Sequence, residues 1–298
     1  MNTLIKPLSE LAEFAKIRET LKKDKSCVSV SGCSDSQKIH MMEGLSDGFQ
    51  CKIIATYSDI RVKEIMDDLR LYERNVYAFP AKDLIFYQAD VHGNRLITER
   101  IKTLRRITQG YPITVVTTFD ALQTPQIPIT VIQNSILKFS KKLAINESHI
   151  SAELVKMGYT RNYQVTEPGQ FSIRGGIIDV FDLTEENPYR IELWGEDVDS
   201  IRSFDVLSQR SIENLESVSI FPATEIILSD ETLKNGLKNI EEEVKQTSKK
   251  MRADFKTEEA YRIESQYKEL KENLTQLGRM TNLESYINYF YSDLCTFT

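Results

Sequence analysis

Residues 158–202 read GYTRNYQVTEPGQFSIRGGIIDVFDLTEENPYRIELWGEDVDSIR and form the most strongly patterned part of the chain. Short runs of β-forming residues alternate with turn signals, and these runs are FSIRG, IIDVFD, YRIELWG and DVDSIRSF. The turn signals between them are Pro168-Gly169, Gly175-Gly176, Glu186-Asn187-Pro188 and Gly195-Glu196. This spacing predicts a small antiparallel meander.

Alternation along these strands predicts one apolar face and one polar face. Phe171 and Ile173 point to the core from the first strand, and Arg174 points away from it. On a later strand, Arg190, Glu192 and Trp194 share the polar face. That face has two interpretations. It is a solvated surface, as antiparallel sheets commonly have, or it is a protein-docking surface, because arginine pairs well with desolvated carboxylates and is enriched among binding hot spots.

Three motifs run through this stretch: GYxR from Gly158, PGxFxxRGxIIDxF from Pro168, and YRIExxGxxxDxIRxFD from Tyr189. Together they resemble the UvrA-binding domain that UvrB shares with the transcription-repair coupling factor Mfd. SQRS at Ser208–Ser211 and FPATE at Phe221–Glu225 extend the resemblance to the N-terminal UvrB-like module of Mfd. The match is long and has few gaps, so it is specific.

The resemblance implies a protein partner, UvrA, which would bring nucleotide excision repair to a stalled RNA polymerase. It places UvrA-contacting residues at Arg161, Arg174, Arg190 and Glu192. UvrB has a further arginine where this chain has Ser172, which implies a less basic surface and a weaker affinity. We expect Arg174→Ala or Arg190→Ala to weaken UvrA binding at least tenfold and to leave folding nearly untouched, since outward substitutions change stability by about 0.5 kcal/mol or less.

Helices and strands alternate over residues 1–120, which predicts a parallel sheet covered by helices. The expected strands are Cys27–Gly32, Lys52–Thr56, Val76–Phe79 and Ile113–Thr117. The expected helices are Leu8–Lys23, Ser36–Leu45, Asp59–Tyr72 and Leu96–Ile107. We expect a helicase-like α/β domain of the P-loop NTPase type.

The turn from the first expected strand to its helix is where a nucleotide site would lie. Gly32 and Lys38 fit the phosphate-loop pattern GxxxxGK[ST], but Gln37 replaces its second glycine and Ile39 replaces the hydroxyl that would hold magnesium. A lysine at such a place is usually solvated. The loop therefore predicts a degenerate, non-functional site, with no cofactor in this chain. The resemblance to Mfd implies the same, and it assigns ATP and Mg²⁺ to a motor domain outside these residues.

Aromatic side chains follow the strand expected at Val76–Phe79. Phe79, Phe86 and Tyr87 form either a ligand platform or the packing of a loop. We favour packing, because aromatic residues in such segments most often bury themselves.

The rest of the chain predicts an inserted domain and a helical end. Strands are expected at Ile129–Ile132 and Ile136–Leu143, and a helix from Asn146 to Lys156 that Gly158 ends. Two long charged helices are expected at Asp230–Lys250 and Glu258–Leu277. We expect residues 124–210 to form a small α/β domain with an antiparallel sheet, the UvrA-binding domain. Residues 1–123 and 211–298 would build the helicase-like domain, which we expect to continue beyond the last residue.

Composition limits the function. The 298 residues carry a net charge of −6 with a pI near 5.4, which argues against a chain whose main task is to grip nucleic acid. The four cysteines form no CxxC pair, so zinc is not expected and the thiols fit a reducing cytoplasm. The start of the chain lacks a secretory pattern, and no apolar run has membrane-spanning length.

The resemblance implies one of two functions. The first is a non-enzymatic adaptor that binds UvrA, and the resemblance assigns RNA polymerase and double-stranded DNA to other domains of the full-length protein. The second is a UvrB-like nucleotide-dependent module that recognises DNA damage. The degenerate loop favours the adaptor.

Overall fold

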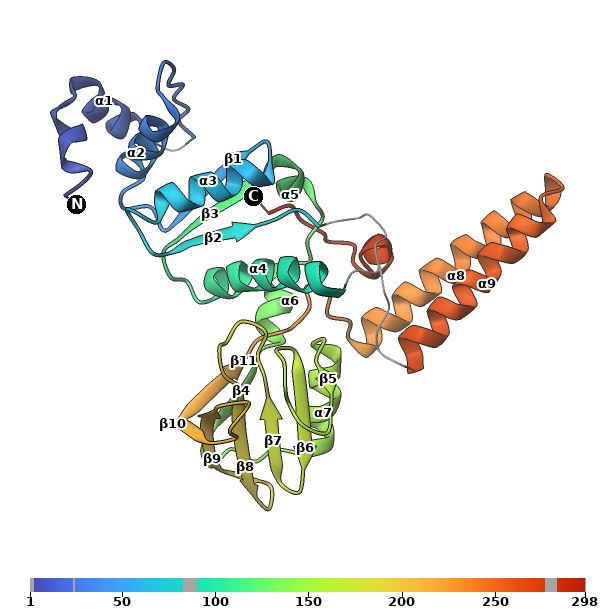
Figure 1. Cartoon of the computed structure of the whole chain (residues 1–298). Helices are drawn as coiled ribbons and strands as arrows, with labels where there is room; N and C mark the ends of the chain where they lie inside the picture. The colour runs from blue at the N-terminus through green and yellow to red at the C-terminus, as the bar shows by residue number, and fades with distance from the viewer. Residues whose placement is uncertain (1–2, 24, 83–89, 277–282, 298) are drawn as a thin grey trace. The chain divides into compact units, whose positions relative to one another are not determined.

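A computed structural model describes residues 3–23, 25–82, 90–276 and 283–297 (Figure 1). The chain divides into two compact units directly after Thr124. Among the described residues, the first unit comprises residues 3–82, Val91–Thr124 and Phe297, and the second comprises Asp90 and Pro125–Thr296.

The first unit contains a parallel sheet of three described strands in the order β1-β3-β2. The strands are β1 (Cys51–Thr56), β2 (Val76–Phe79) and β3 (Ile113–Thr118). Every residue of the central strand β3 is buried, as expected for a strand with covered faces in a parallel sheet. The predictions of these three strands and of their parallel arrangement are confirmed.

Helices connect and flank these strands, and the predicted alternation is confirmed. They are α2 (Asp35–Leu45), α3 (Asp59–Leu69), α4 (Asp90–Thr108) and the short α5 (Phe119–Gln123). The single helix expected from Leu8 to Lys23 is instead a 3₁₀ helix, η1 (Lys6–Glu10), followed by α1 (Ala12–Leu21). Leu11 separates the two because its backbone is extended, with φ −80° and ψ 122°.

The strand expected at Cys27–Gly32 is not formed. These residues have no regular secondary structure, and Val30 is exposed. Alternating valines in CVSVSG predicted a buried strand, but local β-propensity decides little without a neighbouring strand that pairs with it. Phe79, in contrast, is fully buried beneath the Arg100 guanidinium and beside Phe297, which supports the packing interpretation. Phe86 and Tyr87 lie outside the described residues.

The second unit contains a six-stranded sheet in the order β10-β9-β8-β7-β6-β5. The strands are β5 (Thr160–Arg161), β6 (Gln170–Arg174), β7 (Ile177–Val180), β8 (Tyr189–Trp194), β9 (Asp197–Phe204) and β10 (Ser211–Leu215). Neighbours are antiparallel from β6 to β10, and only β5 runs parallel to β6. The predicted meander is confirmed.

One face of this sheet is buried against α7 (Glu147–Lys156) and a two-stranded sheet of β4 (Leu137–Ser140) and β11 (Ser217–Ile220). Asn146 caps α7 by accepting from the His149 N–H at 3.0 Å, and Gly158 ends the segment with φ +88°. The strand expected at Ile129–Ile132 is wrong: these residues begin helix α6 (Ile129–Asn134), with Pro128 at its N-cap.

Two long helices follow, α8 (Asp230–Ala253) and α9 (Thr257–Gln276), which pack side by side as a hairpin (Figure 1). Their prediction is confirmed as far as the described residues reach. The short η2 (Leu283–Tyr286) and α10 (Ile287–Phe290) come next, and α10 packs on α8. The composite domain of residues 1–123 and 211–298, with residues 124–210 inserted, remains a prediction.

Candidate protein-docking surface

The face of the six-stranded sheet opposite α7 carries the residues that alternation assigned to it. Phe171, Ile178 and Ile191 are buried in the core on the α7 side. The neighbouring positions on the same strands therefore point to the other side. These positions hold Ser172, Arg174, Asp179, Arg190 and Glu192, with Arg202 on β9.

Arg190 is held inside this face by a buried carboxylate. Its Nε donates to Asp179 Oδ1 at 2.7 Å and its Nη2 donates to Asp179 Oδ2 at 2.8 Å. Nη2 also donates to Gln209 Oε1 at 2.9 Å, and the guanidinium lies 4.3 Å over the Phe204 ring. The hydrogen bonds to Asp179 raise the pKa of Arg190 above its ordinary value. A bidentate pair of this kind fixes the arginine in one geometry.

The structure contradicts the premise that Arg190 is a surface side chain, so we no longer expect its removal to leave folding untouched. Its side chain is only 14% exposed, and Asp179 is 1% exposed. Truncating Arg190 would leave a buried carboxylate without its main partner, which is a large penalty. Alternation predicted the direction of the side chain correctly but not how far its neighbours cover it.

Arg174 is the more accessible arginine. Its side chain is 37% exposed, and its Nη2 lies 3.5 Å from Asp179 Oδ2. The guanidinium also lies 5.0 Å over the ring of Tyr163, which is itself largely exposed. Arg174 is thus orientated by two neighbours while its outer edge stays open to a partner.

Glu192 is neutralised within the same face. It accepts from Arg202 at 2.6 and 2.9 Å and from the Ser200 hydroxyl at 2.7 Å. The Ser200 hydrogen bond, followed by the Arg202 pair, lowers the pKa of Glu192 below its ordinary value. The polar face is therefore a layer of paired charges.

Arg161 lies apart from the other three. It is exposed on the edge strand β5, in register with Phe171. No hydrogen bond or ion pair between described residues joins it to Arg174, Arg190 or Glu192. Ser172, where UvrB was expected to differ, is buried and donates to the Tyr163 carbonyl at 2.8 Å.

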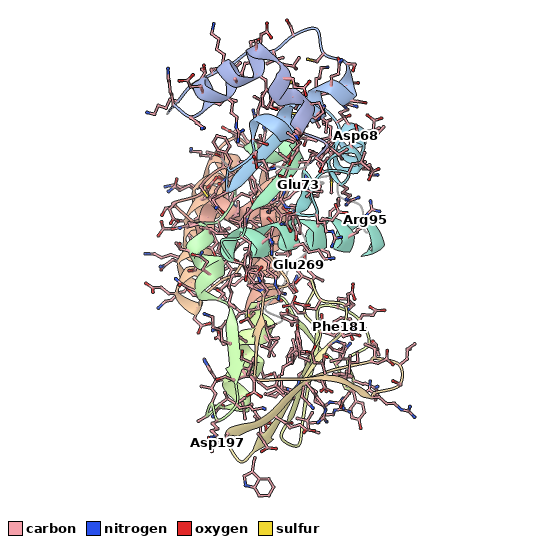
Figure 2. All side chains as sticks on the ribbon, turned by 90° about the vertical axis from the view of Figure 1, so that its left-hand side faces the viewer. Asp68, Glu73, Arg95, Phe181, Asp197 and Glu269 are labelled. Carbon is pink, nitrogen blue, oxygen red and sulfur yellow. The ribbon has the colours of Figure 1, made fainter. Side chains whose placement is uncertain are left out.

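Sequence reasoning missed Asp179 and Arg202 as members of this face. A signal for Asp179 was present, because a carboxylate inside the apolar run IIDV is rarely buried without a cation. It also passed over the one tryptophan of the chain as a site residue. Trp194 is 84% exposed at the outer end of β8, on the same face as Arg190 and Glu192. Figure 2 shows Asp197, which begins β9 across this hairpin, at the end of the sheet remote from Phe181.

The Gly32–Ile39 loop is occupied by its own side chains. The Gln37 side-chain oxygen Oε1 accepts from the Ser34 N–H at 2.8 Å, a backbone donor that a phosphate loop would direct to its ligand. Lys38 Nζ donates to Asp35 at 3.0 Å, and Ile39 is buried in the core. Lys38 and Arg61 both lower the pKa of Asp35, so the loop holds an ionised carboxylate.

No group of three or more His, Cys, Asp or Glu side chains in the described part of the chain is placed to hold a metal ion. Over the same residues, no helix combines the length and the apolar character that crossing a bilayer requires.

Residues 137–226 match the family model described as the UvrB interaction domain. The match covers β4 to β11 and therefore the whole docking face. The chain is also similar to transcription-repair-coupling factors. It is 35% identical to that of Bacillus subtilis (strain 168) over 80% of this chain and 20% of the relative. It is 33% identical to that of Staphylococcus aureus (strain Mu50 / ATCC 700699) over 80% of this chain and 21% of the relative.

The resemblance drawn from the motifs is confirmed by these matches. The chain spans about a fifth of the length of the curated relatives it matches.

Proposed function

We propose that this chain is a docking module that binds UvrA through the polar face of its six-stranded sheet. In a longer protein it would bring excision repair to a stalled RNA polymerase, with the polymerase and double-stranded DNA bound by other domains. The family match over residues 137–226 and the similarity to transcription-repair-coupling factors support the proposal.

One observation carries the proposal: a half-open arginine is held in place on a rigid polar layer. Arg174 lies between Asp179 and Tyr163, and its outer edge remains exposed. The paired Arg190 beneath it keeps Asp179 in position. An arginine that is already orientated loses little conformational entropy when a partner carboxylate binds it. Trp194 adds an exposed aromatic ring of the type that dominates binding hot spots.

We further propose that the module does not depend on nucleotide and is not an enzyme. The contacts made by Gln37 and Lys38 inside the loop support this. A UvrB-like nucleotide-dependent module, in contrast, would need a free loop backbone and a free lysine.

The test is a titration of the chain with purified UvrA. Binding is measured by calorimetry and by the fluorescence of Trp194, the single tryptophan of the chain. We expect saturable binding and a change in the Trp194 signal after subtraction of the UvrA signal. A folded chain that shows no binding at micromolar concentrations would contradict the proposal.

Nucleotide dependence needs a control on this chain, since UvrA could respond to nucleotide itself. We expect Lys38→Ala to bind UvrA as the parent does, with or without Mg-ATP. Binding that requires Mg-ATP and is lost in Lys38→Ala would instead support the UvrB-like function.

A further inference from the structure

The turn that joins α8 to α9 places a phenylalanine where a helix end favours glycine. The Lys256 N–H donates to the Met251 carbonyl at 2.8 Å and the Phe255 N–H donates to the Arg252 carbonyl at 3.2 Å. These two bonds define a Schellman motif, in which the residue after the cap adopts the left-handed conformation. Phe255 occupies that position with φ +60°. Bulky residues rarely adopt this conformation, because Cβ crowds the backbone.

The Phe255 side chain gains no burial in return. It is 94% exposed, and the nearby Tyr261 on α9 is also largely exposed. Single apolar residues on a surface are common and need no explanation alone. A fully exposed ring on a strained backbone is different, because both features oppose stability and neither contributes to the fold. Strain of this kind is typical of functional positions.

Cations outnumber carboxylates in the sequence on both sides of this ring. Residues 245–262 hold six lysines and arginines and three carboxylates, two of which are Glu258 and Glu259 in the first turn of α9, in a chain whose net charge is −6. Lys245 pairs with Glu241 and Arg252 pairs with Glu264. Within the described residues, Lys249, Lys250 and Lys256 make no ion pair, and all three are exposed. The tip of the hairpin is therefore a local basic patch on an acidic protein.

We propose that this hairpin tip, residues 249–256 with Tyr261, binds single-stranded nucleic acid. The three unpaired lysines would contact phosphates, and the Phe255 ring would stack on a base. Aromatic platforms set among cations are the common means of binding single strands without sequence preference. The cations alone would also suit an acidic protein surface, but carboxylate side chains offer the exposed ring no aromatic face, whereas every nucleotide of a single strand offers one. The proposal is independent of UvrA binding, which involves a different surface.

The test measures the fluorescence anisotropy of a labelled oligothymidylate titrated with the full 298-residue chain at low salt. The key variant is Phe255→Gly. Glycine relieves the left-handed strain, so we expect the midpoint of thermal unfolding to rise by about 2–4 °C. Loss of stacking should nevertheless weaken binding at least about fivefold. A variant that is more stable and binds less cannot owe its defect to misfolding.

A second set of variants tests whether the lysines of α8 contact phosphates. The double variant Lys249→Gln/Lys250→Gln should lower the slope of log affinity against log salt by about 1.4, which corresponds to two phosphate contacts. The matched control is Lys238→Gln, which removes an exposed lysine of α8 that pairs with Glu242 away from the tip. The control should bind as the parent does.

Any of three binding results would overturn the proposal, and a competition experiment adds a fourth. The three are no anisotropy change at low salt, an equal loss in the double variant and in the Lys238→Gln control, and unchanged affinity in Phe255→Gly. Competition by polyglutamate as strong as that by unlabelled oligonucleotide would also overturn it, and would assign the tip to an acidic protein.

Discussion

The Asp179–Arg190 pair shows how a single side chain can be outward and yet structural. Arg190→Ala removes both hydrogen bonds that satisfy a carboxylate only 1% exposed. We expect a loss of about 2–4 kcal/mol in the free energy of unfolding, somewhat below the full range for a buried pair, because Arg174 remains 3.5 Å from Asp179. Urea denaturation of parent and variant measures it. A change below 0.5 kcal/mol would show that the pair does not stabilise the sheet.

Glu192 makes the stability of the sheet depend on pH. Its pKa is lower in the folded chain than its ordinary value of 4.5, so the ionised form favours folding. This contribution is complete above the unfolded-state pKa and is lost as the pH falls through the folded-state pKa. We expect the stability difference between the parent and Glu192→Gln to be larger at pH 7 than at pH 3. Equal differences at both pH values in denaturation experiments would contradict this.

The sequence predicted which way these side chains point but not which groups pair. Alternation alone places Arg174, Arg190 and Glu192 on one face. Pairing depends on strand register, which sets Asp179 opposite Arg190 and Ser200 opposite Glu192. Turn lengths and a bulge between Glu192 and Leu193 fix that register, and no local pattern in the sequence shows the bulge.

The packing of α8 against α10 depends on the absence of a side chain at Gly236. A Cβ there would lie 2.0 Å from the Phe290 ring, well inside van der Waals contact. We expect Gly236→Ala to destabilise the chain by about 1–3 kcal/mol through overpacking, although alanine favours a helix interior by about 1 kcal/mol.

A double-mutant cycle separates the two effects. In a Phe290→Ala background the clash is gone, so Gly236→Ala should become neutral or stabilising. A loss of the same size in both backgrounds, measured by thermal unfolding, would show that Phe290 is not the cause.

Among the secondary-structure elements, most of those with long periodic patterns form as predicted, whereas the short apolar runs divide: β1, β2 and β3 form as predicted, but Cys27–Gly32 and Ile129–Ile132 do not form strands. The helices α3, α4, α8 and α9 and the meander strands follow their sequence periods. Ile129–Ile132 was expected to be a strand because it is β-branched, but it forms α6 directly after Pro128, with Ile132 buried. A run of four residues cannot distinguish strand from helix by period, and tertiary packing then decides.

The chain divides into two compact units after Thr124, and the second unit runs on through α8 and α9 to Thr296, while the predicted composite domain remains a prediction. The sequence could not show which part of the chain α8 and α9 pack against, because the pattern of a helix indicates its apolar face but not the element that covers it. Gln37 and Ile39 depart from the phosphate-loop pattern in the sequence, but the strand expected before Gly32 is not formed, so the degenerate phosphate loop remains a prediction.

We predict that the 298-residue chain neither binds ATP tightly nor hydrolyses it. The Ser34 N–H and the Lys38 ammonium, which a nucleotide phosphate would need as donors, already donate to Gln37 and Asp35. Ile39 is buried and has no hydroxyl to hold Mg²⁺. We expect no ATP hydrolysis and no tight Mg-ATP binding by calorimetry. Micromolar affinity that vanishes in Lys38→Ala would reverse this assignment.

The most direct measurement compares UvrA binding by the parent, Arg174→Ala and Lys138→Ala, by calorimetry on chains of matched thermal stability. Lys138 is an exposed cation on β4, outside the polar face of the six-stranded sheet. We predict at least tenfold weaker binding for Arg174→Ala, about 1.4 kcal/mol, with a stability change of about 1 kcal/mol or less, and no change in affinity for Lys138→Ala. Equal UvrA affinity in all three folded chains would contradict the assignment of this face.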